Sequence, residues 1–135
     1  KRLPDIQFTV NVPDELLMVP MDPILIEQVL SNLIENAVNH GVTTTAIHLS
    51  VQKDGDFAAF SVRDNGQGIA PDRLEHLFDG TLQGQQGDRG RSMGIGLSVC
   101  RAIVRAHGGE IYARNKIDGG AEFRFWLPAE EESNT

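Results

Sequence analysis

Two asparagines, Asn32 and Asn36, lie one helical turn apart in the stretch NLIENAVNHG. The residues around them are apolar with a helical period, and asparagine is a mediocre residue inside a helix because its amide competes for backbone hydrogen bonds. Both lie at the border of the predicted apolar face, where a polar group is sheltered yet can reach a ligand. The pattern alone leaves two interpretations open: a binding role, or a pair of helix-end hydrogen bonds or surface asparagines.

Three glycine-containing motifs follow the asparagines: DNGQGI at 64–69, GIGL at 94–97 and HGG at 107–109. DNGQGI can be a strand that ends in a glycine turn. GIGL opens a predicted helix, whose free N–H groups can meet phosphate, but it departs from the dinucleotide pattern GxGxxG at Val99 and follows a loop. None of these motifs identifies a chemistry alone, so the informative signal is their order.

In this order and spacing the motifs resemble the ATP-binding domain of the GHKL superfamily, shared by sensor histidine kinases, type II topoisomerases, Hsp90 chaperones and MutL. The histidine kinase branch is the most similar. IEQVLSNLIENAVNH corresponds to its N box, DNGQGI to its G1 box, Phe78 to its F box and SMGIGL to its G2 box. The resemblance covers nearly the whole chain, and the ending GGAEFRFWLP is similar to the Kdp-type potassium-responsive sensor kinases.

The resemblance implies a site for ATP and Mg²⁺. The asparagine that matches Asn36 binds Mg²⁺ in the family, and a neutral amide oxygen suits this hard cation when phosphates supply the negative charge. Asp64 matches the aspartate that accepts a hydrogen bond from the adenine amino group, where guanine carries a carbonyl oxygen. Asn36 and Asn32 are the implied catalytic residues. The implied nucleotide site comprises Asn32, Asn36, Asn39, His40, Asp64, Gly66, Gly68, Ile69, Arg89, Arg91, Gly94, Ile95, Gly96 and Leu97.

The Gly- and Gln-rich segment 79–92 between two of these motifs is predicted to be a mobile lid. Arg89 and Arg91 within it are available cations for the terminal phosphates, although loop arginines are often simply solvated. Three residues depart from the family pattern. Asn39 stands where many histidine kinases carry a lysine, Ser92 replaces the first glycine of the G2 box, and Thr81 stands where the F box often has a second phenylalanine. Phosphate binding is therefore expected to depend on the lid arginines.

The residue types also discriminate between reactions. The ATPases of the superfamily carry a general-base glutamate four residues before the Mg²⁺ asparagine, and that position here is Asn32. An amide cannot accept the proton of an attacking water, so transfer to another nucleophile is predicted. In histidine kinases this nucleophile is an imidazole on a separate dimerisation helix, and none of the four histidines here resembles it.

The predicted function is therefore that of a protein-histidine kinase fragment without its phosphoacceptor. Its expected partners are adenine nucleotide, an upstream dimerisation domain and a response regulator. Two alternatives stay open: a degenerate adenine-nucleotide sensor that regulates a partner, which Asn39 and Ser92 favour, and a GHKL-type serine kinase.

Composition limits the other possibilities. The 135 residues carry a formal net charge of -7, which opposes binding to nucleic acid or to an anionic membrane surface. No apolar run approaches the roughly 20 residues of a membrane span. We expect a cytoplasmic domain of a longer, membrane-anchored sensor. The single cysteine, Cys100, excludes an internal disulfide and is expected to be buried.

The elements that must position these residues can be predicted from periodicity and turn residues. We expect one domain over residues 1–128 and a solvated tail over 129–135. Its predicted fold is α/β (α+β), a two-layer sandwich in which helices cover one face of a mixed, largely antiparallel sheet of about five strands, as in the Bergerat-type ATP-binding fold. The predicted elements are two short strands within 6–21, helices over 24–40, near 72–77 and from 94 onward, and two hairpins that turn at Asp54-Gly55 and near 118–120.

For the helix that starts at 94, the apolar spacing predicts a buried face of Ile95, Val99, Ala102, Ile103 and Ala106. For the helix over 24–40 it predicts a core face of Ile26, Val29, Leu30, Leu33 and Ala37, widened by Ile34 and Val38.

Overall fold

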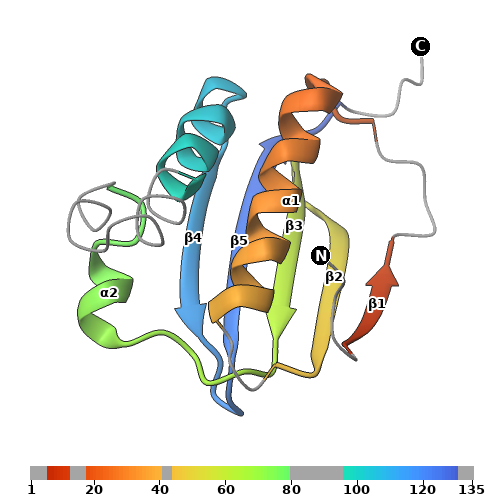
Figure 1. Cartoon of the computed structure of the whole chain (residues 1–135). Coiled ribbons are helices and arrows are strands. Elements are labelled where there is room, and N and C mark those ends of the chain that lie inside the picture. Colours follow the sequence, from red (N-terminus) through yellow and green to blue (C-terminus); the bar gives the residue numbers. More distant parts are fainter. Residues whose placement is uncertain (1–5, 13–17, 41–43, 80–95, 131–135) are drawn as a thin grey trace.

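A five-stranded mixed sheet forms the centre of the molecule. The structure is a computed structural model that describes residues 6–12, 18–40, 44–79 and 96–130, without the side chains of residues 39 and 40. The strand order is β1-β2-β3-β5-β4, and only the β1–β2 pair is parallel. The strands are β1 Gln7–Asn11, β2 Ala46–Asp54, β3 Phe57–Asp64, β4 Glu110–Asn115 and β5 Ala121–Pro128. Helix α1 and the helical residues 96–106 lie side by side on one face (Figure 1), which confirms the predicted fold class.

Helix α1 spans Pro23–His40 and begins where the sequence predicts. Asp22 is its N-cap, because Oδ1 of this residue accepts hydrogen bonds from the backbone N–H groups of Ile24 at 3.0 Å and Leu25 at 3.2 Å. The predicted core face is also confirmed. Its fully buried residues are Ile26, Val29, Leu33 and Ala37, and Leu30, Ile34 and Val38 pack beside them.

The core between the helices and the sheet is aromatic at its centre. Phe60 of β3 and Phe125 of β5 stack with ring centroids 4.7 Å apart. Cys100 of the helical segment is fully buried in the same core, as predicted.

Both predicted hairpins form. The β2–β3 turn consists of Gly55 and Asp56, and Gly55 has a φ of 62°. The β4–β5 hairpin turns through Gly119 and Gly120, both with positive φ. A Cβ on Gly120 would lie 2.0 Å from the backbone oxygen of Asp64, so this turn packs directly against the end of β3.

The HGG motif joins the helical residues 96–106 to β4. Nδ1 of His107 donates to the Ile103 carbonyl at 2.8 Å, and Nε2 accepts from the backbone N–H of Asp22 at 3.1 Å. Gly108 has a φ of 87°, and a Cβ on Gly109 would lie 1.7 Å from the Trp126 carbonyl oxygen. The motif therefore ties the end of one helix to the start of the other and to β5.

One sequence prediction about the elements is wrong. The helical residues 96–106 bury Leu97, Cys100, Ile103 and Val104, whereas Val99, Ala102 and Ala106 are exposed. Apolar side chains occur all round this segment, so its spacing alone did not select the buried face. In the N-terminal part, β1 is the only described strand. Most of the second predicted strand lies outside the described residues, and Met18, which follows that gap, forms an isolated bridge with Glu130.

The short helix α2 spans Pro71–Glu75, close to the predicted range. Ala129 and Glu130, assigned to the tail, donate backbone hydrogen bonds to Asp56 and Met18. Most of the predicted lid, residues 80–92, lies outside the described residues, as does 131–135. No helix in the described part of the chain is long and apolar enough to cross a membrane.

Candidate functional site

Asn36 lies on the sheet-facing side of α1 and is only 6% exposed. Its side-chain amide makes no hydrogen bond with any other residue that the structure describes, and it is not among the fully buried unpaired groups, so it is reachable from solvent. The side chain instead lines a small pocket between α1 and the sheet. The other lining residues are Ala37, Asp64, Gly68, Ile69, Ala121 and Phe123. A sheltered amide that faces a pocket is suited to bind a ligand.

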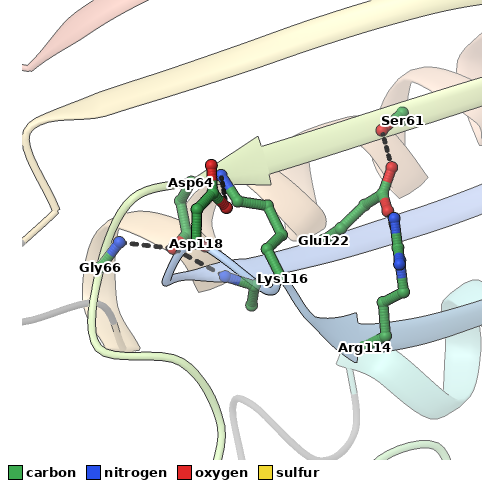
Figure 2. A network of polar contacts seen from close by, with 8 residues as sticks. Ser61, Asp64, Gly66, Arg114, Lys116, Asp118 and Glu122 are labelled. Atoms are coloured by element: carbon green, nitrogen blue, oxygen red, sulfur yellow. Dashed lines mark hydrogen bonds and ion pairs between the residues drawn. The ribbon is translucent and has the colours of Figure 1, made fainter.

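Asp64 is the last residue of β3 and is also 6% exposed. Its Oδ1 accepts hydrogen bonds from the backbone N–H groups of Gly66 at 2.8 Å and Ala121 at 3.3 Å. Figure 2 shows this carboxylate beside the glycine loop and the end of the β4–β5 hairpin. The two bonds fix the orientation of the carboxylate at the pocket, and the structure thus brings the N box and the G1 box together.

The glycine loop after Asp64 is held by a residue that the sequence analysis missed. Oδ1 of Asn115, at the end of β4, accepts from the N–H of Ile69 at 2.7 Å, and its Nδ2 donates to the Ile69 carbonyl at 2.9 Å. Gly68 has a φ of 84°, and a Cβ there would lie 2.8 Å from Oδ1 of Asn115. A strand-end asparagine is a common turn residue, so nothing in the sequence distinguished it.

Asn65 of the same motif has a structural role. Its Oδ1 accepts from the backbone N–H groups of Thr45 at 2.9 Å and Ala46 at 3.0 Å, and its Nδ2 donates to Oγ1 of Thr45 at 3.0 Å. These bonds tie the end of β3 to the beginning of β2. Asn65 therefore supports the position of its neighbour Asp64.

Asn32 lies one turn before Asn36 and is half-buried. Its Nδ2 donates to Sγ of Cys100 at 3.6 Å, and a Cβ on Gly96 would lie 3.6 Å from the same nitrogen. Burial raises the pKa of the Cys100 thiol, and the hydrogen bond from Asn32 opposes this only in part. The thiol is therefore neutral, and Asn32 joins the N box to the G2 box at Gly96.

Other predicted site residues lie around this centre. Phe78 packs edge-on against Phe123 of the pocket wall, with ring centroids 6.3 Å apart. Leu97 is 3% exposed and belongs to the hydrophobic core. The remaining predicted site residues cannot be compared, because Arg89, Arg91, Gly94 and Ile95, and the side chains of Asn39 and His40, lie outside the described residues.

The donor set limits the chemistry of the pocket. Within the described ranges, no three His, Cys, Asp or Glu side chains are grouped so that they could hold a metal ion. Glu35, the carboxylate nearest to Asn36 in sequence, is exposed on another side of α1. The pocket offers one unpaired amide and one fixed carboxylate, which fits a metal that arrives with its own anionic ligand.

The family model for histidine kinase-, DNA gyrase B- and HSP90-like ATPases matches residues 21–131 of this sequence. The chain belongs to this ATPase family. The match includes every described site residue, and solved structures of histidine kinase catalytic domains have the same fold, so this is a histidine kinase-type ATPase domain.

The curated relatives include sensor kinases of the Kdp type. The chain is 42% identical over 126 residues to the sensor protein KdpD of Clostridium acetobutylicum, a match covering 92% of this chain and 14% of that protein. It is 37% identical over 121 residues to KdpD of Escherichia coli, covering 90% and 14%. The chain thus spans about one seventh of the length of these relatives.

Solved structures support the same branch of the ATPase family. The nucleotide-free catalytic domain of histidine kinase ThkA has a TM-score of 0.77 at 31% identity, covering 92% of this chain and 79% of that one. Full-length ShkA in complex with AMPPNP has a TM-score of 0.77 at 28% identity, covering 95% and 26%. ThkA in complex with the response regulator TrrA has a TM-score of 0.72 at 29% identity, covering 91% and 34%.

Proposed function

We propose that this ATPase domain binds Mg²⁺-ATP in the pocket between α1 and the sheet and supplies the γ-phosphate to a histidine of a dimerisation domain in the full-length protein. A response regulator would then receive the phosphate, and a membrane anchor elsewhere in the protein would hold the sensor. The complex of ThkA with a response regulator supports the regulator as partner.

One observation carries the proposal. Asn36 is 6% exposed, has no hydrogen-bond partner among the described residues, and lines the same pocket as Asp64. Among the described residues the amide of Asn36 is not one of the buried side-chain groups without a partner, so it is reachable from the pocket although the residue as a whole is buried. A ligand that enters the pocket can therefore contact this amide directly.

The residues have separate roles in the proposed complex. Asn36 offers its amide oxygen to Mg²⁺, which would be bound mainly by the nucleotide phosphates and would neutralise their charge during transfer. Asp64 accepts a hydrogen bond from the exocyclic amino group of adenine. Asn115 keeps the backbone of Ile69 in place beside the base. Arg89, Arg91 and the backbone of Gly94 to Leu97 are the proposed phosphate contacts.

The pocket supports transfer in preference to hydrolysis. Asn32, at the position of the ATPase general base, carries an amide that cannot accept a proton, and its Nδ2 already donates to Cys100. Glu35 is exposed and faces away from the pocket. Because neither Asn32 nor Glu35 can act as a general base there, and Asp64 is assigned to the adenine end of the pocket, bound ATP would persist until an acceptor imidazole reaches it.

Calorimetry of the chain with Mg²⁺-ADP tests the site. Asn36→Ala should weaken Mg²⁺-dependent binding at least tenfold while circular dichroism shows an unchanged fold. Gln28→Ala is the matched control, because it removes an exposed amide from the same helix. Equal affinities for the wild type and Asn36→Ala would contradict the proposed role of Asn36.

Phosphotransfer must be measured in the full-length protein that contains this domain. Radiolabelled γ-phosphate should appear on a histidine, as an acid-labile and base-stable product, and Asn36→Ala should abolish it. Nucleotide binding without any such product would instead indicate a nucleotide sensor.

A further inference from the structure

We propose that the face of the sheet turned away from α1 carries a second ligand site, which binds a small oxyanion. A pocket of about 390 Å³ lies there at the ends of β2, β3 and β4. This volume falls in the range of small-molecule sites, roughly 300–1,000 Å³. Its lining includes four residues with basic side chains: His48, Arg63, Arg114 and Lys116.

The basic lining contrasts with the charge of the whole chain. The formal net charge is -7, yet three arginine or lysine side chains converge on this pocket against two carboxylate residues, Asp64 and Asp118. Oδ1 of Asp64 is already engaged by the backbone of Gly66 and Ala121. Asp118 is 83% exposed and lies 4.0 Å from Lys116, a distance at which an exposed ion pair contributes little.

The negative charge of Glu122, the cross-strand neighbour of Arg63 and Arg114, is already compensated. Glu122 is 2% exposed, and its two carboxylate oxygens accept from Oγ of Ser61 at 2.7 Å and from Nε of Arg114 at 2.7 Å (Figure 2). Burial acts to raise the pKa of Glu122, but the hydrogen bonds from Ser61 and Arg114 and the charges of Arg114 and Arg63 outweigh it and lower the pKa. Arg114 is thus balanced by Glu122.

Of the arginine and lysine residues that line the pocket, Arg63 makes no ion pair with a described residue, whereas Arg114 and Lys116 each make one. Arg63 stands between His48 and Glu122 in the sheet register, and its Nε is buried without a hydrogen-bond partner. Nδ1 of His48 is occupied by Oγ1 of Thr9. Because Nε of Arg63 has almost no accessible surface, a ligand in the pocket would meet the terminal nitrogens of the guanidinium, which suit the planar, two-point contact that phosphate or carboxylate oxygens provide. Lys116, beyond the end of β4, adds a second charge at the rim.

The proposed ligand is therefore a phosphate- or carboxylate-bearing small molecule that contacts Arg63 and Lys116. Consecutive residues of a strand point to opposite faces, so Arg63 and Asn36 lie on opposite sides of the sheet, although Asp64 lines both pockets. The site does not depend on the proposed kinase function.

An amide NMR titration of the nucleotide-free chain tests the site, with inorganic phosphate in one arm and succinate in the other at constant ionic strength. We expect saturable shifts at Ala46, Asn65 and Ile117, which surround the pocket. Tighter binding of phosphate would assign a phosphate-bearing ligand, and tighter binding of succinate a carboxylate-bearing one.

Variants of the chain make the titration decisive. Arg63→Gln and Lys116→Gln should each weaken binding at least fivefold, and the second keeps the test valid if the first disturbs the fold. Arg105→Gln is the control, because this arginine pairs with Glu110 away from the pocket. Shifts that do not saturate, that persist in both variants, or that occur only at Gly68 and Ile69 would overturn the proposal.

Discussion

The two faces of the sheet meet at the end of β3, where Arg63 and Asp64 follow one another and point in opposite directions. On the helix-covered face, Asp64 and Asn36 are isolated polar groups in apolar surroundings. On the other face, Ser61, Glu122 and Arg114 form a network that satisfies its own members. Among the described residues, the first face leaves Asn36 without a hydrogen-bond partner and the second leaves Nε of Arg63 without one, but only the second also carries a side-chain network that stabilises the sheet. The comparison shows why the pairing of polar groups, more than their number, indicates the site.

The largest expected effect on stability comes from a substitution at Gly120, where the β4–β5 turn packs against the end of β3. In Gly120→Ala, a Cβ would lie 2.0 Å from the Asp64 carbonyl at a residue with a φ of 87°. The left-handed conformation alone costs about 1–2 kcal/mol and the clash adds about 1–3 kcal/mol. Urea unfolding should thus show a loss of about 3 kcal/mol.

Gly55→Ala is the matched control for that measurement, since its φ is 62° but nothing lies within 4 Å of the new Cβ. It should lose only the conformational part, about 1 kcal/mol. Equal losses in the two variants would show that the turn at Gly120 does not press against β3.

A smaller loss of stability is expected from removing Asn115, and its effect on amide exchange should be confined to the helix-covered face. Asn115→Ala removes both hydrogen bonds to the backbone of Ile69, each contributing about 0.5–1.5 kcal/mol. We expect a stability loss of about 1–2 kcal/mol and faster amide exchange at Ile69. Arg124→Gln, on the opposite face with a 3.9 Å ion pair to Asp54, should leave exchange at Ile69 unchanged. Similar amide exchange at Ile69 in both variants would contradict the role of Asn115 in holding this backbone.

The smallest expected effect concerns pH and the second face. The pKa of Glu122 is lower in the folded chain, so its contribution to stability is complete above the unfolded pKa of about 4.3 and is lost as the pH falls through the folded value. Unfolding free energies between pH 6 and 3 should therefore decline more steeply for the wild type than for Glu122→Gln. Parallel pH profiles would show that the network does not hold this carboxylate in its charged form.

Local signals in the sequence predicted most of the fold. The Asp22 cap, the regular spacing of apolar residues in α1 and the glycine of the β2–β3 turn are each encoded by neighbouring residues. The buried face of residues 96–106 was predicted incorrectly because apolar side chains surround that segment, and the contacts with α1 and β5 select among them.

The candidate site divides in the same way. Asn36 and Asp64 were predicted from motifs and their resemblance to a family, and the structure brings both to one pocket. The hydrogen bonds of Asn115 to Ile69 and of Asp22 to His107 were not predicted, because each joins residues more than 40 positions apart. No local pattern reports such a contact.

The central claim is that the pocket on the helix-covered face selects adenine through Asp64. Competition calorimetry of the wild type and Asp64→Asn with Mg²⁺-ADP and Mg²⁺-GDP tests it most directly, with Arg124→Gln as a control on the opposite face. The wild type and the control should prefer ADP by at least tenfold, because the guanine carbonyl would meet the carboxylate oxygen. Asp64→Asn should reduce this preference severalfold or more. Equal binding of ADP and GDP by the wild type, or an unchanged preference in Asp64→Asn, would contradict the account.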